Sequence, residues 1–223
     1  MTQLRLGSST ALWTHMAVLA LAAIPGAALA QPGNAGAAIA AKGTPGGAAA
    51  CVACHGAKGE GNAAAGFPRL AGLPADYLAA QLDHFAAERR KNPVMGPVAK
   101  QLTAAERKAV AAYYGALPAA QALAIDDGAG LRAADTGAWL ALRGRWDSNL
   151  PACVQCHGPG GAGIGAAFPA LAGQSSAYIA AQLHAFKSGT RPGGPQDLMK
   201  VVASKLADGD ITALADYFGG RKP

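Results

Sequence analysis

The chain has 223 residues, a length that suits one domain or two small ones, and its formal net charge at pH 7 is +6. Hydrophobic residues make up 51% and charged residues 14% of the chain, so the bulk charge identifies no partner by itself. The densest basic cluster is residues 89–91, and no basic run is interleaved with aromatic residues. This pattern argues against nucleic acid as a partner.

The first segment, residues 1–30, is expected to be a signal peptide that is cleaved on export. It holds one charged residue, Arg5, then an apolar run over residues 11–24 and an Ala-Leu-Ala end. An uncleaved membrane anchor is the alternative, but the run is short for a bilayer span and breaks at Pro25. The mature chain is therefore expected in the periplasm, without stable membrane insertion.

Two copies of Cys-x-x-Cys-His contain all the cysteine of the chain: Cys51, Cys54 and His55, then Cys153, Cys156 and His157. Two thiols one helical turn apart can add to the two vinyl groups of one porphyrin, while the adjacent imidazole reaches its iron. The motif predicts two covalently bound haem c groups with the histidines as axial ligands. A four-thiolate zinc site and two redox-active disulfides are alternatives that leave the histidines unexplained.

The second half of the chain repeats the first. FPRLAG at residues 67–72 matches FPALAG at residues 168–173, and the segments that follow match as DYLAAQL and AYIAAQL. Such self-similarity predicts a tandem duplication of one domain. We expect a first domain at residues 31–120 and a second at residues 121–223, with a linker near residues 118–130, where Pro, Gly and Asp accumulate.

Each unit is predicted to be all-α, because apolar residues recur at helical spacing and strand signals are sparse. The stripes are Leu78, Leu82 and Phe85 in the first copy and Ile179, Leu183 and Phe186 in the second. A last helix follows in each copy, with a capping box at Thr103 and Glu106 in the first and Asp208 as a candidate cap in the second. A unit this small buries a modest core alone, so a haem is expected at its centre and the apo-domain is expected to be largely unfolded.

Met95 and Met199 are the predicted second axial ligands. They are the only methionines outside the expected signal peptide, and both lie between the amphipathic helix and the last helix of their unit. The rival ligands, His84 and His184, have no histidine counterpart in the other copy and are expected at the surface. His/Met ligation fills both axial positions, which predicts outer-sphere electron transfer and not catalysis at iron.

With CxxCHG, FPxLAG, the helix after it and a loop methionine each present twice, the chain resembles the dihaem class I cytochromes c of the c4 type over nearly all of residues 48–220. The resemblance implies two tandem class I cytochrome c domains, related by approximate two-fold symmetry, with the haem edges close across the interface. It also implies that the carbonyls of Pro68 and Pro169 accept hydrogen bonds from the axial histidine rings.

Two departures from the family pattern precede the haem motifs. Glycines and a proline at residues 43–47 weaken the helix expected before Cys51, and residues 139–150 have no match in the first copy. Neither departure touches a proposed ligand.

The resemblance implies a soluble two-domain monomer that carries electrons in the periplasm, from a quinol-oxidising cytochrome complex to a haem-copper terminal oxidase, and is not itself an enzyme. The alternative is an electron-accepting subunit of a periplasmic dehydrogenase that oxidises sulfide or an alcohol. A dihaem peroxidase is disfavoured, because that reaction needs an iron position that opens to peroxide.

Overall fold

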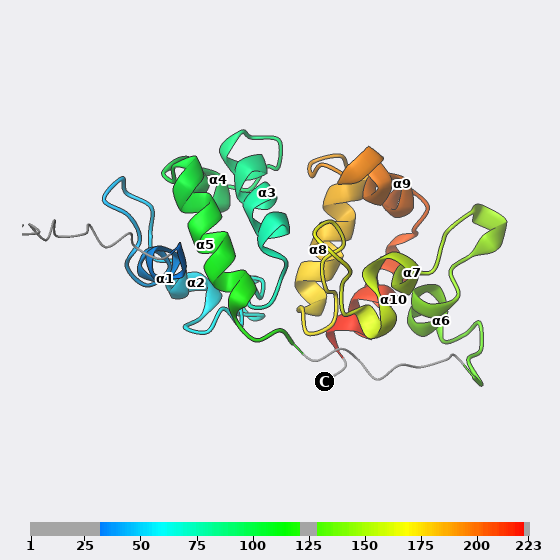
Figure 1. Ribbon diagram of the computed structural model, residues 1–223. Coiled ribbons are helices and arrows are strands. Elements are labelled where there is room, and N and C mark those ends of the chain that lie inside the picture. The colour runs from blue at the N-terminus through cyan, green and yellow to red at the C-terminus, as the bar shows by residue number, and fades with distance from the viewer. Residues whose placement is uncertain (1–31, 121–128, 221–223) are drawn as a thin grey trace, which may run out of the picture.

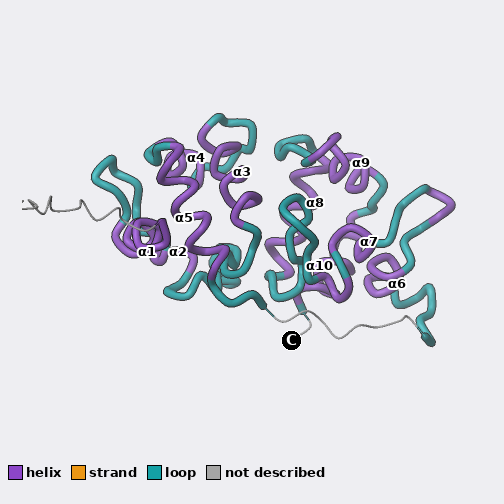
Figure 2. Tube along the Cα trace, in the orientation of Figure 1, coloured by secondary structure: helices purple, strands orange, loops and turns teal. Residues whose placement is uncertain are grey.

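The computed structural model describes residues 32–120 and 129–220, and within them two groups of helices lie side by side (Figure 1). Figure 2 shows helices joined by loops, and the described ranges contain three isolated β-bridges but no β-strand. The all-α prediction is therefore confirmed. The expected signal peptide and most of the expected linker lie outside the described residues.

The two halves contain the same series of elements. The first half holds α1 (Pro32–Lys42), α2 (Val52–His55), α3 (Ala75–Ala86), α4 (Met95–Lys100) and α5 (Ala104–Ala116). The second half holds α6 (Thr136–Leu142), α7 (Cys153–His157), α8 (Ser176–Lys187), α9 (Leu198–Ser204) and α10 (Asp208–Gly219), with short 3-10 turns η1 (Trp146–Ser148), η2 (Pro159–Gly161) and η3 (Pro195–Asp197). Within residues 32–120 and 129–220, no helix is long and apolar enough to cross a membrane.

Each half buries its own apolar core, built on its last helix. The predicted stripes face these cores: Leu78 and Phe85 are buried on α3, and Ile179 and Phe186 are buried on α8. Helix α5 packs against α1 and α3, and α10 packs against α6 and α8. The same packing plan thus holds in both halves.

The helix before each haem motif crosses the last helix at a glycine. A Cβ atom on Gly36 of α1 would lie 2.2 Å from the carbonyl oxygen of Ala109, and one on Gly137 of α6 would lie 2.2 Å from that of Ala213. Only glycine permits this close approach of two backbones.

The structure corrects both expectations about the segments before the haem motifs. The weakened helix before Cys51 is present as α1, because its residues end at Lys42, just before the breakers begin. The unmatched stretch is partly matched, since Trp139 lies in α6, the counterpart of α1. Its remainder turns back on itself, with paired backbone hydrogen bonds between Arg145 and Leu150.

The last helix of each half, α5 or α10, is capped at its N-terminus in a related way. At α5, the predicted capping box is confirmed: the Glu106 N–H donates to Thr103 Oγ1 (3.2 Å) and the Thr103 N–H donates to Glu106 Oε2 (2.7 Å). At α10, the Asp210 carboxylate accepts from the N–H of Ala207 (2.9 Å). The expectation that Asp208 caps α10 is wrong, because its side chain is bound by a lysine of α8.

The two halves also contact each other directly, around Arg69. Its Nη2 and Nε donate to the carbonyls of Ala172 (3.1 Å) and Gly173 (3.2 Å) in the second half. The Gln174 side chain accepts from the Arg69 N–H (3.0 Å) and donates to the Arg69 carbonyl (3.1 Å). These four hydrogen bonds hold the halves together at one end of the face shared by α3 and α8.

Candidate functional site: two haem cavities

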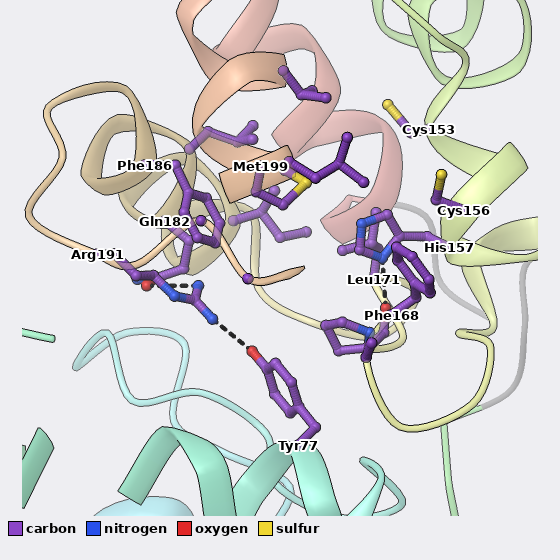
Figure 3. A pocket seen from close by; sticks show the side chains of 18 of the residues that line it. Tyr77, Cys153, Cys156, His157, Phe168, Leu171, Gln182, Phe186, Arg191 and Met199 are labelled. Carbon is purple, nitrogen blue, oxygen red and sulfur yellow. Dashed lines mark hydrogen bonds between the residues drawn. The ribbon is translucent and has the colours of Figure 1, made fainter. Parts of the chain in front are cut away.

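Each half forms most of an open cavity that brings its predicted site residues together. The cavity of the first half, about 520 Å³, is lined by Cys51, Cys54, His55 and Met95. The cavity of the second half, about 630 Å³, is lined by Cys153, Cys156, His157 and Met199. Figure 3 shows His157 of α7 and Met199 of α9 reaching into the second cavity from different elements. Cavities of this size hold small molecules and cofactors in proteins.

The two histidine rings are fixed by backbone carbonyls. His55 Nδ1 donates to the Pro68 carbonyl (2.9 Å), and His157 Nδ1 donates to the Pro169 carbonyl (2.7 Å, Figure 3). Burial lowers the pKa of both imidazoles, against the opposing effect of these carbonyls. Each ring is therefore neutral with its proton on Nδ1, which leaves the Nε2 lone pair free to bind a metal.

A tight loop delivers each proline carbonyl to its histidine. In the first half, the His55 carbonyl accepts from the Gly61 N–H (2.8 Å), and Gly61 adopts a φ of 84°. A Cβ atom there would lie 2.6 Å from the Arg69 nitrogen, so the loop needs glycine at this position. Gly163 plays the same part in the second half, with its N–H 2.7 Å from the His157 carbonyl.

The two methionines reach equivalent places by different loops. Met95 begins α4, and its N–H donates to Asn92 Oδ1 (2.8 Å) at the end of a short loop. Met199 is the second residue of α9, and its N–H donates to the Gly193 carbonyl (2.9 Å) at the end of a longer loop. Both side chains are half-buried. Because α4 packs on α3 and α9 packs on α8, each methionine is carried to the wall of its own cavity.

The cysteines fit covalent attachment to an apolar group better than the alternatives. The two pairs line different cavities, so they cannot form a single four-thiolate zinc site. Burial raises the pKa of Cys153 to about 12 and raises that of Cys51 as well. A redox-active dithiol needs the opposite shift. All four thiols are unpaired, and the cavity walls are mostly aliphatic and aromatic, as a porphyrin requires.

One difference between the cavities lies on the last helices. Tyr114 of α5 lines the first cavity, whereas Phe218 of α10 lines the second. The Tyr114 hydroxyl is buried, and burial together with the neighbouring Cys51 thiol raises its pKa. Phe218 has no hydroxyl, so at this position only the first cavity places a hydroxyl beside its first cysteine, Cys51.

The polar residues between the halves were not predicted from the sequence. The expectation of surface histidines holds for the exposed His184, but His84 is half-buried and lines the second cavity from the first half. Arg90 and Arg191 were not predicted to be functional, yet both are buried beside the cavities. A signal was available, because both copies share the spacing Tyr-x3-Gln-x3-Phe-x4-Arg.

Two haem-attachment motifs, each at the wall of an apolar cavity in its own helical domain, define a dihaem c-type cytochrome. The sequence model of the cytochrome c family matches this chain twice, over residues 34–117 and 148–220. The chain belongs to the cytochrome c family, as a two-domain member of the c4 type, and it binds haem c covalently at both CxxCH motifs.

Named relatives and solved structures are similar to this chain over most of its length. A thiosulfate dehydrogenase electron acceptor of Stutzerimonas stutzeri (strain A1501) is 52% identical over 165 residues, which cover 74% of this chain and 76% of the relative. The solved thiosulfate dehydrogenase (TsdBA) of Marichromatium purpuratum is 46% identical, with a TM-score of 0.76 over 85% of this chain. This chain covers only 40% of that protein. Reduced cytochrome c4 of Pseudomonas stutzeri is 35% identical, with a TM-score of 0.66 over 76% of this chain and 92% of that one.

Proposed function

We propose that this dihaem electron carrier works in the periplasm as the electron acceptor of a thiosulfate dehydrogenase. The observation that carries the proposal is the 52% identity to a protein named for that role, against 35% to a solved cytochrome c4. A further support is the solved thiosulfate dehydrogenase that contains a region similar to 85% of this chain.

The proposal extends to the iron ligands. His55 and Met95 would hold the first haem iron, and His157 and Met199 would hold the second. Their support is that each pair lines one cavity together with its own cysteines. Bound haem supplies a one-electron Fe(III)/Fe(II) couple. The chain's part is to exclude water, to hold the imidazole through the proline carbonyl and to keep the axial positions filled.

The electron count suits this donor. Joining two thiosulfate anions through a new sulfur–sulfur bond releases two electrons and no protons. Two bound haems, each a one-electron acceptor, would take up both electrons. A two-domain carrier would therefore accept both electrons of one turnover. It could then pass them on one at a time to a terminal oxidase.

The donor in this proposal differs from the one that the sequence favoured. The family resemblance implied a quinol-oxidising cytochrome complex as the donor, and a dehydrogenase of sulfide or alcohol was the alternative. The relatives support the dehydrogenase role, with thiosulfate as the substrate. The similarity to cytochrome c4 supports the quinol-linked shuttle as the competing function.

A stopped-flow experiment separates the two donors. Oxidised holoprotein is mixed with purified thiosulfate dehydrogenase and thiosulfate, and haem reduction is followed by absorbance; mixtures lacking the enzyme or lacking thiosulfate are the controls. We expect both haems to be reduced only in the complete mixture. Reduction no faster than in the controls, together with rapid reduction by a quinol-oxidising complex and quinol, contradicts the proposal.

A further inference from the structure

A layer of polar side chains crosses from the first domain to the second between α3 and α8. Arg90, which follows α3, donates from Nη2 to Tyr178 Oη (2.9 Å) and to Gln182 Oε1 (2.6 Å), both on α8. Its Nη1 donates to Gln81 Oε1 (2.9 Å) within its own domain. One guanidinium thus bonds to both domains.

Arg191 repeats the arrangement from the other side. Its Nη2 donates to Tyr77 Oη (2.7 Å) on α3, and its Nη1 donates to Gln182 Oε1 (3.0 Å), as Figure 3 shows. The same Nη2 also donates to Gln81 Oε1 (3.2 Å) on α3. The two arginines occupy equivalent places in the duplication, and so do the tyrosines and the glutamines. The contacts are therefore reciprocal, as an approximate two-fold axis requires.

These two positive charges are buried without a counter-ion. Arg90 and Arg191 are each 6% exposed, and their guanidinium carbons lie 4.4 Å from the ring centres of Phe85 and Phe186. The salt bridges within residues 32–120 and 129–220 all involve other cations. In the same described part, the buried Nε of Arg191 has no hydrogen-bond partner. Buried charges are normally paired, since an unpaired one is costly.

The surrounding groups respond to this positive charge. Burial alone would raise the pKa of Tyr178, but the two guanidinium groups outweigh it and lower that pKa. Burial lowers the pKa of Arg90, and the charge of Arg191 lowers it further. The layer therefore favours a negative charge, and no carboxylate of residues 32–120 and 129–220 forms an ion pair with either arginine.

A haem bound in either adjoining cavity would supply a negative charge to the two arginines. Both arginines line the first cavity, and Arg191 also lines the second. In the second cavity, Cys153 and Cys156 lie at one end and Arg191 at the other (Figure 3). A porphyrin joined to cysteines through its vinyl groups carries its two propionates on the opposite edge. A porphyrin held by Cys153 and Cys156 would therefore turn that edge toward Arg191.

We infer that Arg90 and Arg191 form a two-guanidinium site at the domain interface that binds one propionate carboxylate from each haem. Arginine suits this task because its planar fork binds a carboxylate through two donors at once. Because Arg191 borders both cavities, the two haems share one charged network, and a change of charge in the network acts on both irons. The site is independent of which protein donates the electrons.

The test compares holoproteins carrying Arg90→Gln or Arg191→Gln with wild type in a spectropotentiometric titration. Loss of a positive charge beside the haems favours Fe(III), so each single variant is expected to shift both reduction potentials in the negative direction. Arg132→Gln, which removes the same charge from an exposed side chain, is the matched control and is expected to shift neither. Redox-difference infrared spectra are expected to show altered carboxylate bands in the two interface variants only.

A second pair of variants separates charge from packing. Arg90→Lys and Arg191→Lys keep the charge, so their potentials are expected to stay nearer to wild type than those of the glutamine variants. If one glutamine variant does not fold, its partner in the other domain carries the same prediction. The inference is overturned if the glutamine variants lose thermal stability with both potentials and the carboxylate bands unchanged, or if lysine and glutamine have equal effects.

Discussion

Replacing Arg69 by Met is expected to weaken the contact between the two domains. Arg69 is 6% exposed, and two hydrogen bonds of its guanidinium cross to carbonyls of the second domain. Hydrogen bonds from a charged donor contribute about 1.5–3 kcal/mol each, so the gross loss is about 3–6 kcal/mol. The burial that lowers the pKa of Arg69 marks a desolvation cost, which methionine no longer carries and which offsets part of this loss. We expect a net loss of about 2 kcal/mol.

Denaturant unfolding of the holoprotein measures this loss. Tryptophan fluorescence reports the second domain, because Trp139 and Trp146 are the only tryptophans outside the expected signal peptide. Haem absorbance reports both domains. Arg132→Met is the matched control, since its side chain is 79% exposed and the expected change is within about 0.5 kcal/mol. An Arg69→Met variant as stable as this control refutes the reasoning.

Three further predictions concern the cores and caps. Gly36→Ala forces a Cβ atom against the Ala109 carbonyl and is expected to cost about 1–3 kcal/mol of unfolding free energy, whereas Gly209→Ala, with open space around it, is expected to cost nothing. Asp210→Asn is expected to cost about 1–2 kcal/mol at pH 7. Burial opposes ionisation of Asp210, but its hydrogen bonds, led by that from Arg145, hold its pKa below the usual value. The difference from wild type is therefore complete above about pH 4, the unfolded pKa, and disappears as pH falls through the folded pKa; a constant difference contradicts the assignment. Protein made without haem attachment is expected to give a largely unfolded circular dichroism spectrum, and a native-like helical one counts against a haem-centred core.

The local chemistry of the site was predictable because it fixes residue types at short spacing. The haem motifs, the stripes around Leu78 and Ile179 and the capping box at Thr103 each depend on neighbours within a few residues. The Pro68 and Pro169 hydrogen bonds came from the family resemblance, and both are present in the structure. The axial role of the methionines stays a prediction.

Features that depend on distant contacts were not predictable in the same way. Helix α1 is rich in alanine and glycine, so its sequence gives little sign of the face that packs on α5. In the sequence, Arg90 appeared only as part of the basic cluster at residues 89–91, and its contacts with Tyr178 and Gln182 of the other domain are visible only in the structure. Only the identity of the two copies at these positions pointed to a shared role.

The central claim is that the chain carries two His/Met haem irons, one in each domain. A spectropotentiometric titration of wild type beside Met95→Ala and Met199→Ala tests it most directly. We predict two haems per chain, loss of about half of the far-red iron–sulfur absorption in each variant, and a lower potential for one haem each time. Unchanged far-red absorption in both variants contradicts the account.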